Sequence, residues 1–143
     1  MSVVNLVALI KTKIAAMQTV NSVYDYEKAW DSSVKFPVAT VTLHQGEGRF
    51  ETTAHNLRIN QFYIRVYQEK VGTVEGGQGA SNAERISRQT LDEMLTAFDS
   101  DTTLSGNVKW VTPVRWSAAY VDREMDSRVL EVIVETHELV ASI

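Results

Sequence analysis

The segment from Asn56 to Glu69 constrains the fold most, because it is an extended run with bulky side chains at both alternating sets of positions. One set consists of Leu57, Ile59, Gln61, Tyr63, Arg65 and Tyr67, and the other of Phe62, Ile64 and Val66. Successive side chains of a strand point to opposite faces of its sheet. The segment therefore predicts a central strand with one face on helices and the other against a partner or a second subunit.

Three further extended segments are expected to pair with it. The run from Val38 to His44 follows Pro37, is rich in Val and Thr, and is predicted to end at Gly46 and Gly48. A third segment, from Val108 to Tyr120, places its bulky residues on one parity if no bulge intervenes, and Pro113 within it favours an edge position or a bulge. A polar turn over 122–127 then leads to a last strand, in which Leu130, Val132 and Val134 alternate with Glu131, Ile133 and Glu135.

Two helices are predicted from apolar residues at helical spacing. The first spans about residues 3–19 and has Ser2 in position to cap it. The second begins with the capping-box pair Ser81 and Glu84 and ends near Phe98. Residues 20–36 are predicted to form a connecting loop with a short strand.

A glycine-rich stretch separates the two halves of the chain. Residues 71–80 hold four of the seven glycines, which predicts a mobile loop around Gly76, Gly77 and Gly79. The stretch lacks the Gly-Lys-Ser/Thr ending of a phosphate-binding loop and the spacing of a dinucleotide fingerprint. Nucleotide binding is therefore not expected here.

These elements predict one α+β domain over residues 1–143. Its sheet is expected to be mainly antiparallel, with about four strands and with two α-helices packed on one face. A chain of 143 residues is of the usual size for one domain.

Composition narrows the classes of function. Eighteen acidic residues against fourteen basic ones give a formal net charge of -4, which disfavours sequence-specific nucleic-acid binding. The chain has no cysteine, which excludes thiol catalysis and thiolate metal sites. The apolar run over residues 2–10 is too short to cross a bilayer, so no membrane association is expected.

No catalytic or metal-binding constellation stands out. The three histidines, His44, His55 and His137, lie on different segments and lack the spacing of ligands on one helix. Acidic residues of the last strand and of the 99–101 loop are better explained as a solvated surface than as an acid–base pair. No Gly-x-Ser-x-Gly occurs around Ser81 or Ser87. We therefore expect no cofactor and no metal site, and nucleophilic hydrolysis is not supported.

Aromatic residues are more numerous than one covered sheet face requires. They are Trp30, Tyr63, Tyr67, Trp110, Trp116 and Tyr120. Two explanations stay open: the loop around Tyr24 to Trp30 folds over the second face, or another copy of the chain covers it, since Trp, Tyr and Arg commonly dominate protein interfaces. The loop from His44 to His55, with Arg49, Phe50 and Glu51, is a further candidate for contact. The predicted interface residues are therefore Trp30, Arg49, Phe50, Glu51, Tyr63, Tyr67 and Trp116.

Several of these segments together resemble a known family. The order Phe36-Pro37-Val38-Ala39-Thr40-Val41, then Asn56-Leu57-Arg58, then Phe62 to Glu69, resembles the tail terminator or tail completion proteins of long-tailed bacteriophages. The helix from Ala83 to Asp99, Leu104-Ser105-Gly106 and a closing hairpin extend the likeness over residues 3–140. Residues 20–36 carry no pattern that matches the family.

The resemblance implies a structural protein of the virion rather than an enzyme. Its copies would close into a ring, usually a hexamer, that caps the tail tube at its head-proximal end, ends tube polymerisation and presents a surface for head attachment. The implied partners are other copies, the tail tube protein and head–tail connector proteins, and assembly would take place in the host cytoplasm. Head–tail joining or neck proteins share much of this outline and remain an alternative. A small-ligand enzyme or binding domain is the alternative from a different class.

Overall fold

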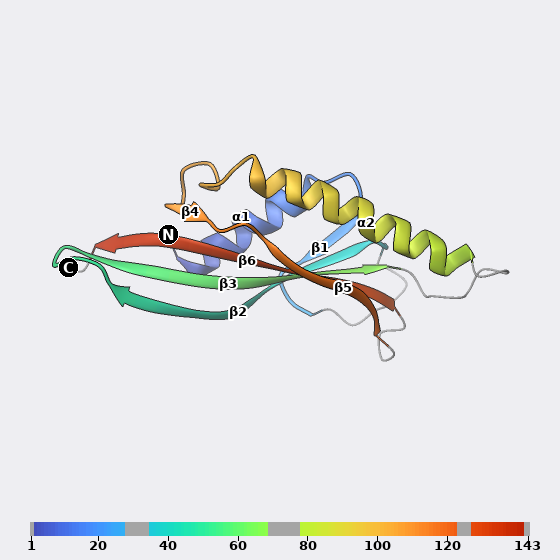
Figure 1. Cartoon of the computed structure of the whole chain (residues 1–143), viewed down its shortest axis with the longest axis horizontal. Coiled ribbons are helices and arrows are strands. Elements are labelled where there is room, and N and C mark those ends of the chain that lie inside the picture. The colour runs from blue at the N-terminus through green and yellow to red at the C-terminus, as the bar shows by residue number, and fades with distance from the viewer. Residues whose placement is uncertain (1, 28–34, 69–77, 123–126, 142–143) are drawn as a thin grey trace.

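Two helices lie against one six-stranded sheet in a computed structural model that describes residues 2–27, 35–68, 78–122 and 127–141 (Figure 1). In chain order the elements are α1 (Val3–Ala15), β1 (Ser22–Tyr24), β2 (Val38–Phe50), β3 (His55–Gln68), α2 (Gln78–Asp99), β4 (Trp110–Val111), β5 (Arg115–Asp122) and β6 (Ser127–Ala141). The strand order is β1-β2-β3-β6-β4, with β5 also paired to β6. No helix within the described ranges is both long and apolar enough to span a membrane.

The predicted α+β class is confirmed, while the sheet differs in detail. It is mixed and has six strands rather than about four, because β1 adds to β2 in parallel and the third extended segment is divided into β4 and β5. All other pairings are antiparallel. The short strand predicted within residues 20–36 is β1.

Both helices differ from their predicted bounds at one end. Ser2 caps α1 as expected, since its hydroxyl accepts a hydrogen bond of 3.2 Å from the Asn5 N–H. The helix ends at Ala15, before the predicted residue 19, because the Met17 N–H turns back to the Ile14 carbonyl. The second helix begins at Gln78, so Ser81 is not its N-cap and Gly79 lies in its first turn rather than in a loop. Each residue added to a helix that has already formed contributes a hydrogen bond. This gain outweighs the tendency of the Ser81–Glu84 capping box to start the helix at Ser81.

The strand β2 is longer than predicted, because Gly46 and Gly48 do not end it. Its ladder with β3 continues to Phe50 opposite Asn56, with one irregularity between Leu43 and Gln45. A Cβ atom on Gly46 would meet Asn60 Oδ1 at 2.6 Å and the Ile59 carbonyl at 2.9 Å. Gly46 therefore permits a close approach of two strands, which is a second role of glycine within a strand.

A bulge around Pro113 separates β4 from β5, as the proline predicted. Three residues of this segment, 112–114, face two residues of β6 between the pairs Val111–Thr136 and Arg115–Ile133. An extra residue reverses the alternation of side chains. Trp110 and Trp116 therefore point to opposite faces, because the condition for a common face, that no bulge intervenes, is not met.

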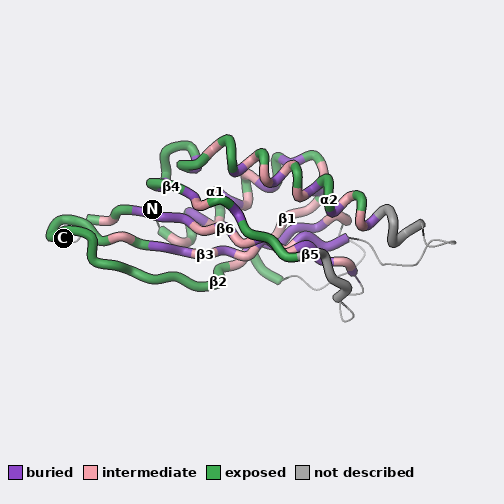
Figure 2. Tube along the Cα trace, viewed as in Figure 1, coloured by how far each residue is buried: buried purple, intermediate pink, exposed green. Residues whose placement is uncertain are grey.

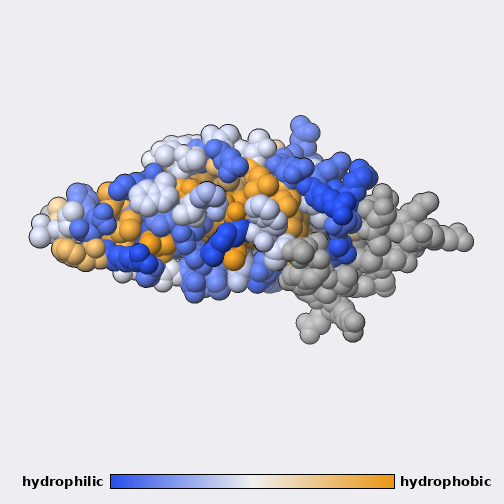
Figure 3. All heavy atoms as spheres, viewed as in Figure 1, coloured by the Kyte–Doolittle hydropathy of each residue, from blue (hydrophilic) through white to orange (hydrophobic). Residues whose placement is uncertain are grey.

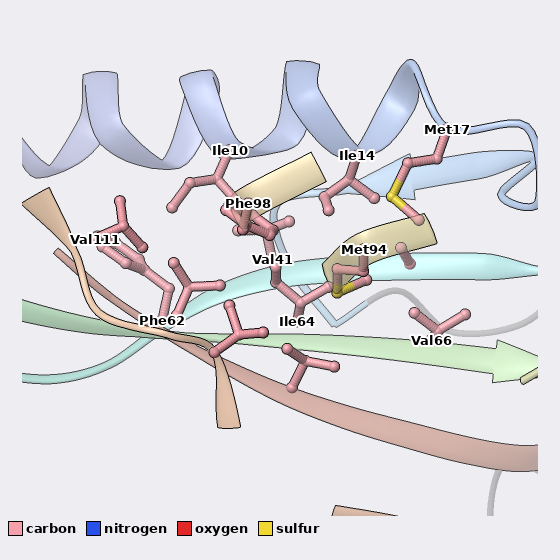
Figure 4. Close-up of a cluster of buried hydrophobic side chains, with 14 of the residues drawn as sticks. Ile10, Ile14, Met17, Val41, Phe62, Ile64, Val66, Met94, Phe98 and Val111 are labelled. Carbon is pink, nitrogen blue, oxygen red and sulfur yellow. The ribbon is translucent and has the colours of Figure 1, made fainter. Parts of the chain in front are cut away.

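The core lies between both helices and one face of the sheet, which we call the covered face. Figure 4 shows Ile10 and Ile14 of α1 and Met94 and Phe98 of α2 directed toward the strands. The strands contribute Val41, Phe62, Ile64, Val66, Leu130, Val132 and Val134, all buried. The opposite face, which we call the open face, carries the alternating residues, such as Thr42, Tyr63 and Ile133.

The distal parts of β2 and β3 form a long hairpin that we call the arm, residues 43–58. It extends beyond the two helices (Figure 1), and Figure 2 shows its β2 strand exposed along this length. Phe50 near its tip is 75% exposed. Packing on the helices therefore ends where the arm begins.

Two phenylalanines on the same hairpin test this division. Replacing Phe62, which is fully buried, with Ala is expected to lower the free energy of unfolding by about 3–5 kcal/mol, because it leaves a cavity under both helices. Phe50→Ala is the matched control and should change stability by less than about 0.5 kcal/mol in a single copy. Urea denaturation followed by tryptophan fluorescence measures both. Equal losses would contradict the placement of the core.

Candidate assembly surface

The open face has polar rows in its middle and a small buried apolar cluster at one end, where Tyr24 and Phe36 pack against Val38, Tyr67 and Val129. Its middle row joins Thr40, Arg65 and Glu131 across three strands, and a second row joins Gln45, Gln61 and Glu135. Tyr63 lies between these rows, partly buried. The middle of the face that no described helix covers is therefore polar and ordered.

Glu27, in the loop after β1, connects three side chains at one end of this face. Its carboxylate accepts hydrogen bonds from Thr40 Oγ1 at 3.0 Å, Arg65 Nη1 at 3.1 Å and the Tyr67 hydroxyl at 2.8 Å. Arg65 also donates through Nε to Glu131 at 3.1 Å. Glu27, together with Tyr24 and Phe36, thus covers the second face at this end, which supports part of the loop explanation for the covering of aromatic residues.

The charges around Arg65 favour its protonated state. Burial by itself lowers the pKa of Arg65, but hydrogen bonds and ion pairs with Glu131 and Glu27 outweigh it, so the pKa is raised above its ordinary value. The guanidinium also lies over the Tyr63 ring, 4.5 Å from its centroid. Arg65 is therefore a charged side chain that joins β3, β6 and the loop after β1.

Glu135 is the centre of a second cluster farther along the face. It accepts hydrogen bonds from Gln61 Nε2 at 2.7 Å and interacts with His137 Nε2 at 2.9 Å, and the His137 ring stacks on Trp110 with centroids 4.6 Å apart. The Gln61 hydrogen bond, and to a lesser extent His137, lower the pKa of Glu135 against the opposing effect of burial. A carboxylate with a lowered pKa is a poor general acid at neutral pH.

The arm presents the opposite character, with exposed apolar and charged side chains. Leu43 is 52% exposed, and Glu47 and Arg49 form a solvent-exposed ion pair at 2.8 Å. Figure 3 shows apolar residues at the surface at the end of the molecule that holds the arm, and in a band along the middle of the view. Contiguous exposed apolar surface is typical of interaction sites.

A second exposed aromatic lies at the other edge of the sheet. Trp116 of β5 is 52% exposed and borders a cavity of about 170 Å³ beside α2, which Leu91 and Leu130 also line. Its partner across the ladder is Val132, a core residue, so Trp116 belongs to the covered face. Trp110 belongs to the open face because its partner is His137.

The structure separates the predicted interface residues into three groups. Arg49, Phe50 and Glu51 are exposed on the arm, and Trp116 is exposed on β5. Tyr63 is half-buried on the open face, and Tyr67 is only 4% exposed in a single copy. Trp30 lies outside the described residues, as do Gly76 and Gly77 of the predicted mobile loop.

Sequence reasoning missed Glu27 and Gln61 as the residues that organise the open face. Glu27 lies in a segment without periodicity, and its three partners come from β2 and β3. The role of Glu27 as a shared hydrogen-bond acceptor can be recognised only once the strands that carry its partners are aligned in space. The sequence offered one signal of a polar row: Gln61 lies on the same parity as Tyr63 and Arg65, so the three side chains share a face.

The described residues contain no cluster that would form a metal site. No group of three His, Asp or Glu side chains is close enough there to hold a metal ion. A groove of about 570 Å³ runs between α1 and α2 beside Met17, Glu93 and Thr96. Glu93 is used structurally in this region, since it accepts hydrogen bonds from the Thr19 N–H and hydroxyl.

Comparison of the chain with protein-family models finds no match, and comparison with curated proteins finds none either.

The Glu135 cluster makes a testable pKa prediction. Gln61→Leu removes the strongest donor to Glu135, so the pKa of that carboxyl is expected to rise toward its ordinary value. Since the folded pKa is lowered, the stability contributed by Glu135 is present above the unfolded pKa and is lost as pH falls through the folded one. The variant should lose less stability over that interval.

Carbon-13 NMR titration of the Glu135 carboxyl measures the effect directly. Gln45→Leu is the matched control, because Gln45 donates to Gln61 Oε1 and does not contact Glu135. A Glu135 pKa that responds equally to both substitutions would contradict the assignment.

The Glu27 cluster is tested by a pair of tyrosines. Tyr67→Phe removes a buried hydroxyl that donates to Glu27 and is expected to lower the free energy of unfolding by about 1 kcal/mol. Tyr63→Phe should be nearly neutral, because the Tyr63 hydroxyl has only a 3.5 Å contact with His44 at an exposed site. Thermal unfolding of both variants decides the matter, and a larger loss for Tyr63→Phe would contradict it.

Proposed function

We propose that this chain is a tail terminator of a long-tailed bacteriophage, a structural protein whose copies form a ring on the end of the tail tube. The resemblance of its sequence order to that family suggests this role. The observation that supports it best is the incomplete cover of the sheet: helices pack on one face, while the arm and β5 expose Leu43, Phe50 and Trp116. Such a protomer has surface available for identical copies.

A ring is the closed form that this arrangement favours. Three of the exposed apolar residues, Leu43 and Phe50 of β2 and Trp116 of β5, lie on two different edges of the sheet rather than on one self-complementary patch. The other large exposed apolar side chains of the described residues are Val4, Tyr26, Trp110 and Leu139. Contacts between different surfaces of identical subunits generate a ring when the rotation closes. A hexamer is the copy number that the resemblance implies.

The proposed partners follow from this position in the virion. The ring would contact the tail tube protein on one side and head–tail connector proteins on the other, at the head-proximal end of the tail, after assembly in the host cytoplasm. The formal net charge of -4 suits a channel that DNA must traverse without binding.

Addition of the protein to polymerising tail tubes tests this function. Tubes assembled from the major tail protein encoded with this chain are expected to stop growing and to carry a ring at one end in negative-stain images. The arm variant Phe50→Ala is expected to reduce capping while leaving the fold intact. Unchanged tube length, with the protein absent from tube ends, would contradict the proposal.

Two other outcomes identify the alternatives. Binding to a portal–connector complex but not to bare tubes would indicate a head–tail joining protein. A rise in melting temperature with a small ligand, together with no effect on tubes, would indicate a ligand-binding domain that uses the groove between α1 and α2.

A further inference from the structure

Two edges of the sheet lack a strand partner among the described residues. The strand β1 pairs with β2 only at Val38–Thr40, so β2 from Val41 to Phe50 has β3 on one side alone. The strand β5 is paired with β6 on one side alone. Free edges present unpaired backbone N–H and C=O groups, which are ready to pair with another chain.

We propose that the free β2 edge of one copy pairs, antiparallel, with the β5 edge of the next copy, so that the sheet continues across the subunit boundary. This inference rests on the proposed self-assembly and specifies the surfaces that carry it. Strand direction, the faces of the exposed apolar residues and the placement of charge support it independently.

Strand direction permits this pairing. The strand β3 is antiparallel to both β2 and β6, and β5 is antiparallel to β6. Within one copy, β5 therefore runs opposite to β2. Copies related by rotation about an axis along the strands keep these directions, so β5 of one copy runs antiparallel to β2 of its neighbour.

The exposed apolar residues of the two edges lie on the same face. Leu43 is in the row of Phe62 and Val134, and Phe50 is in the row of Asn56 and Val140, both on the covered side. Trp116 is in the row of Val132, also on the covered side. Residues opposite each other across a ladder share a face, so pairing would bring Leu43 toward Trp116 and the cavity beside it.

Charge selects one register over its neighbour. On the open side β2 carries Glu47 and Arg49, and β5 carries the exposed Arg115. Registers that preserve the faces differ by two residues. Arg49 opposite Arg115 would be repulsive, whereas Glu47 opposite Arg115 is attractive. In the second register Trp116 lies opposite Gly46. Because His44 is the extra residue of the β2 bulge, Leu43 is the next covered-side residue after Gly46 and lies diagonally across from Trp116.

Charge reversal tests the register. Arg115→Glu is expected to weaken self-association about tenfold by placing two acids opposite each other, and the further change Glu47→Arg should restore it. Arg85→Glu, at an exposed arginine of α2, is the matched control and should have little effect. Sedimentation velocity over a concentration series measures association, and circular dichroism checks that each variant is folded.

Disulfide trapping tests the pairing without relying on strong association. The chain has no cysteine, so the double variant Glu47→Cys with Arg115→Cys has two thiols, which lie on opposite edges of its own sheet. Oxidation of concentrated protein should give a reducible ladder of linked chains, since directly opposite Cβ atoms are close enough for a disulfide. Arg49→Cys with Arg115→Cys should give much less.

The outcomes separate this inference from the proposed function. Rings that form without the 47–115 ladder would overturn the edge pairing and leave the terminator role standing. A ladder without any effect on tube length would support the pairing and contradict that role. Dimers from Glu47→Cys alone would indicate β2–β2 pairing, and the absence of any linked species at the highest concentration would overturn the inference.

Discussion

The long antiparallel pairing of β3 with β6 is the constraint on which the rest of the structure depends. It runs from His55–Ala141 to Gln68–Arg128 without a break in register. Because side chains alternate, this ladder creates two faces along its whole length. One face carries Phe62, Ile64, Val132 and Val134, and both helices pack against it. The other face carries Arg65 and Gln61 with their acidic partners.

The two faces are stabilised by different physics. Burial of apolar surface holds α1 and α2 on the covered face and needs no particular partner beyond a good fit. The open face relies on paired groups such as Arg65 with Glu131 and Gln61 with Glu135, each of which would cost free energy if left unpaired. Ordered polar rows can therefore remain on a sheet face that no helix of the described residues covers.

Edge strands shape what this fold is suited to do. Proteins commonly protect such edges with charge, bulges or short strands, and here β1 covers only the first residues of β2. The bulges at Leu43–Gln45 and around Pro113 change which side chains each edge presents. The bulge at Pro113 places Trp116 on the same side as Leu43 and Phe50, and this arrangement makes β2 and β5 complementary in the proposed assembly.

The sequence by itself determined the α+β class, the central position of residues 56–68, the Ser2 cap and the interruption at Pro113, because each depends on local periodicity or on the chemistry of one residue. Tertiary structure decided the rest. Gly46 resembled a strand end, but it lies within β2, where a side chain would collide with Asn60 of β3. Glu27 became the partner of Thr40, Arg65 and Tyr67 only when distant segments met. The alternation of residues in the sequence predicts which face of the sheet each side chain of one strand points to. Bulges and cross-strand contacts depend instead on how the strands are aligned in space.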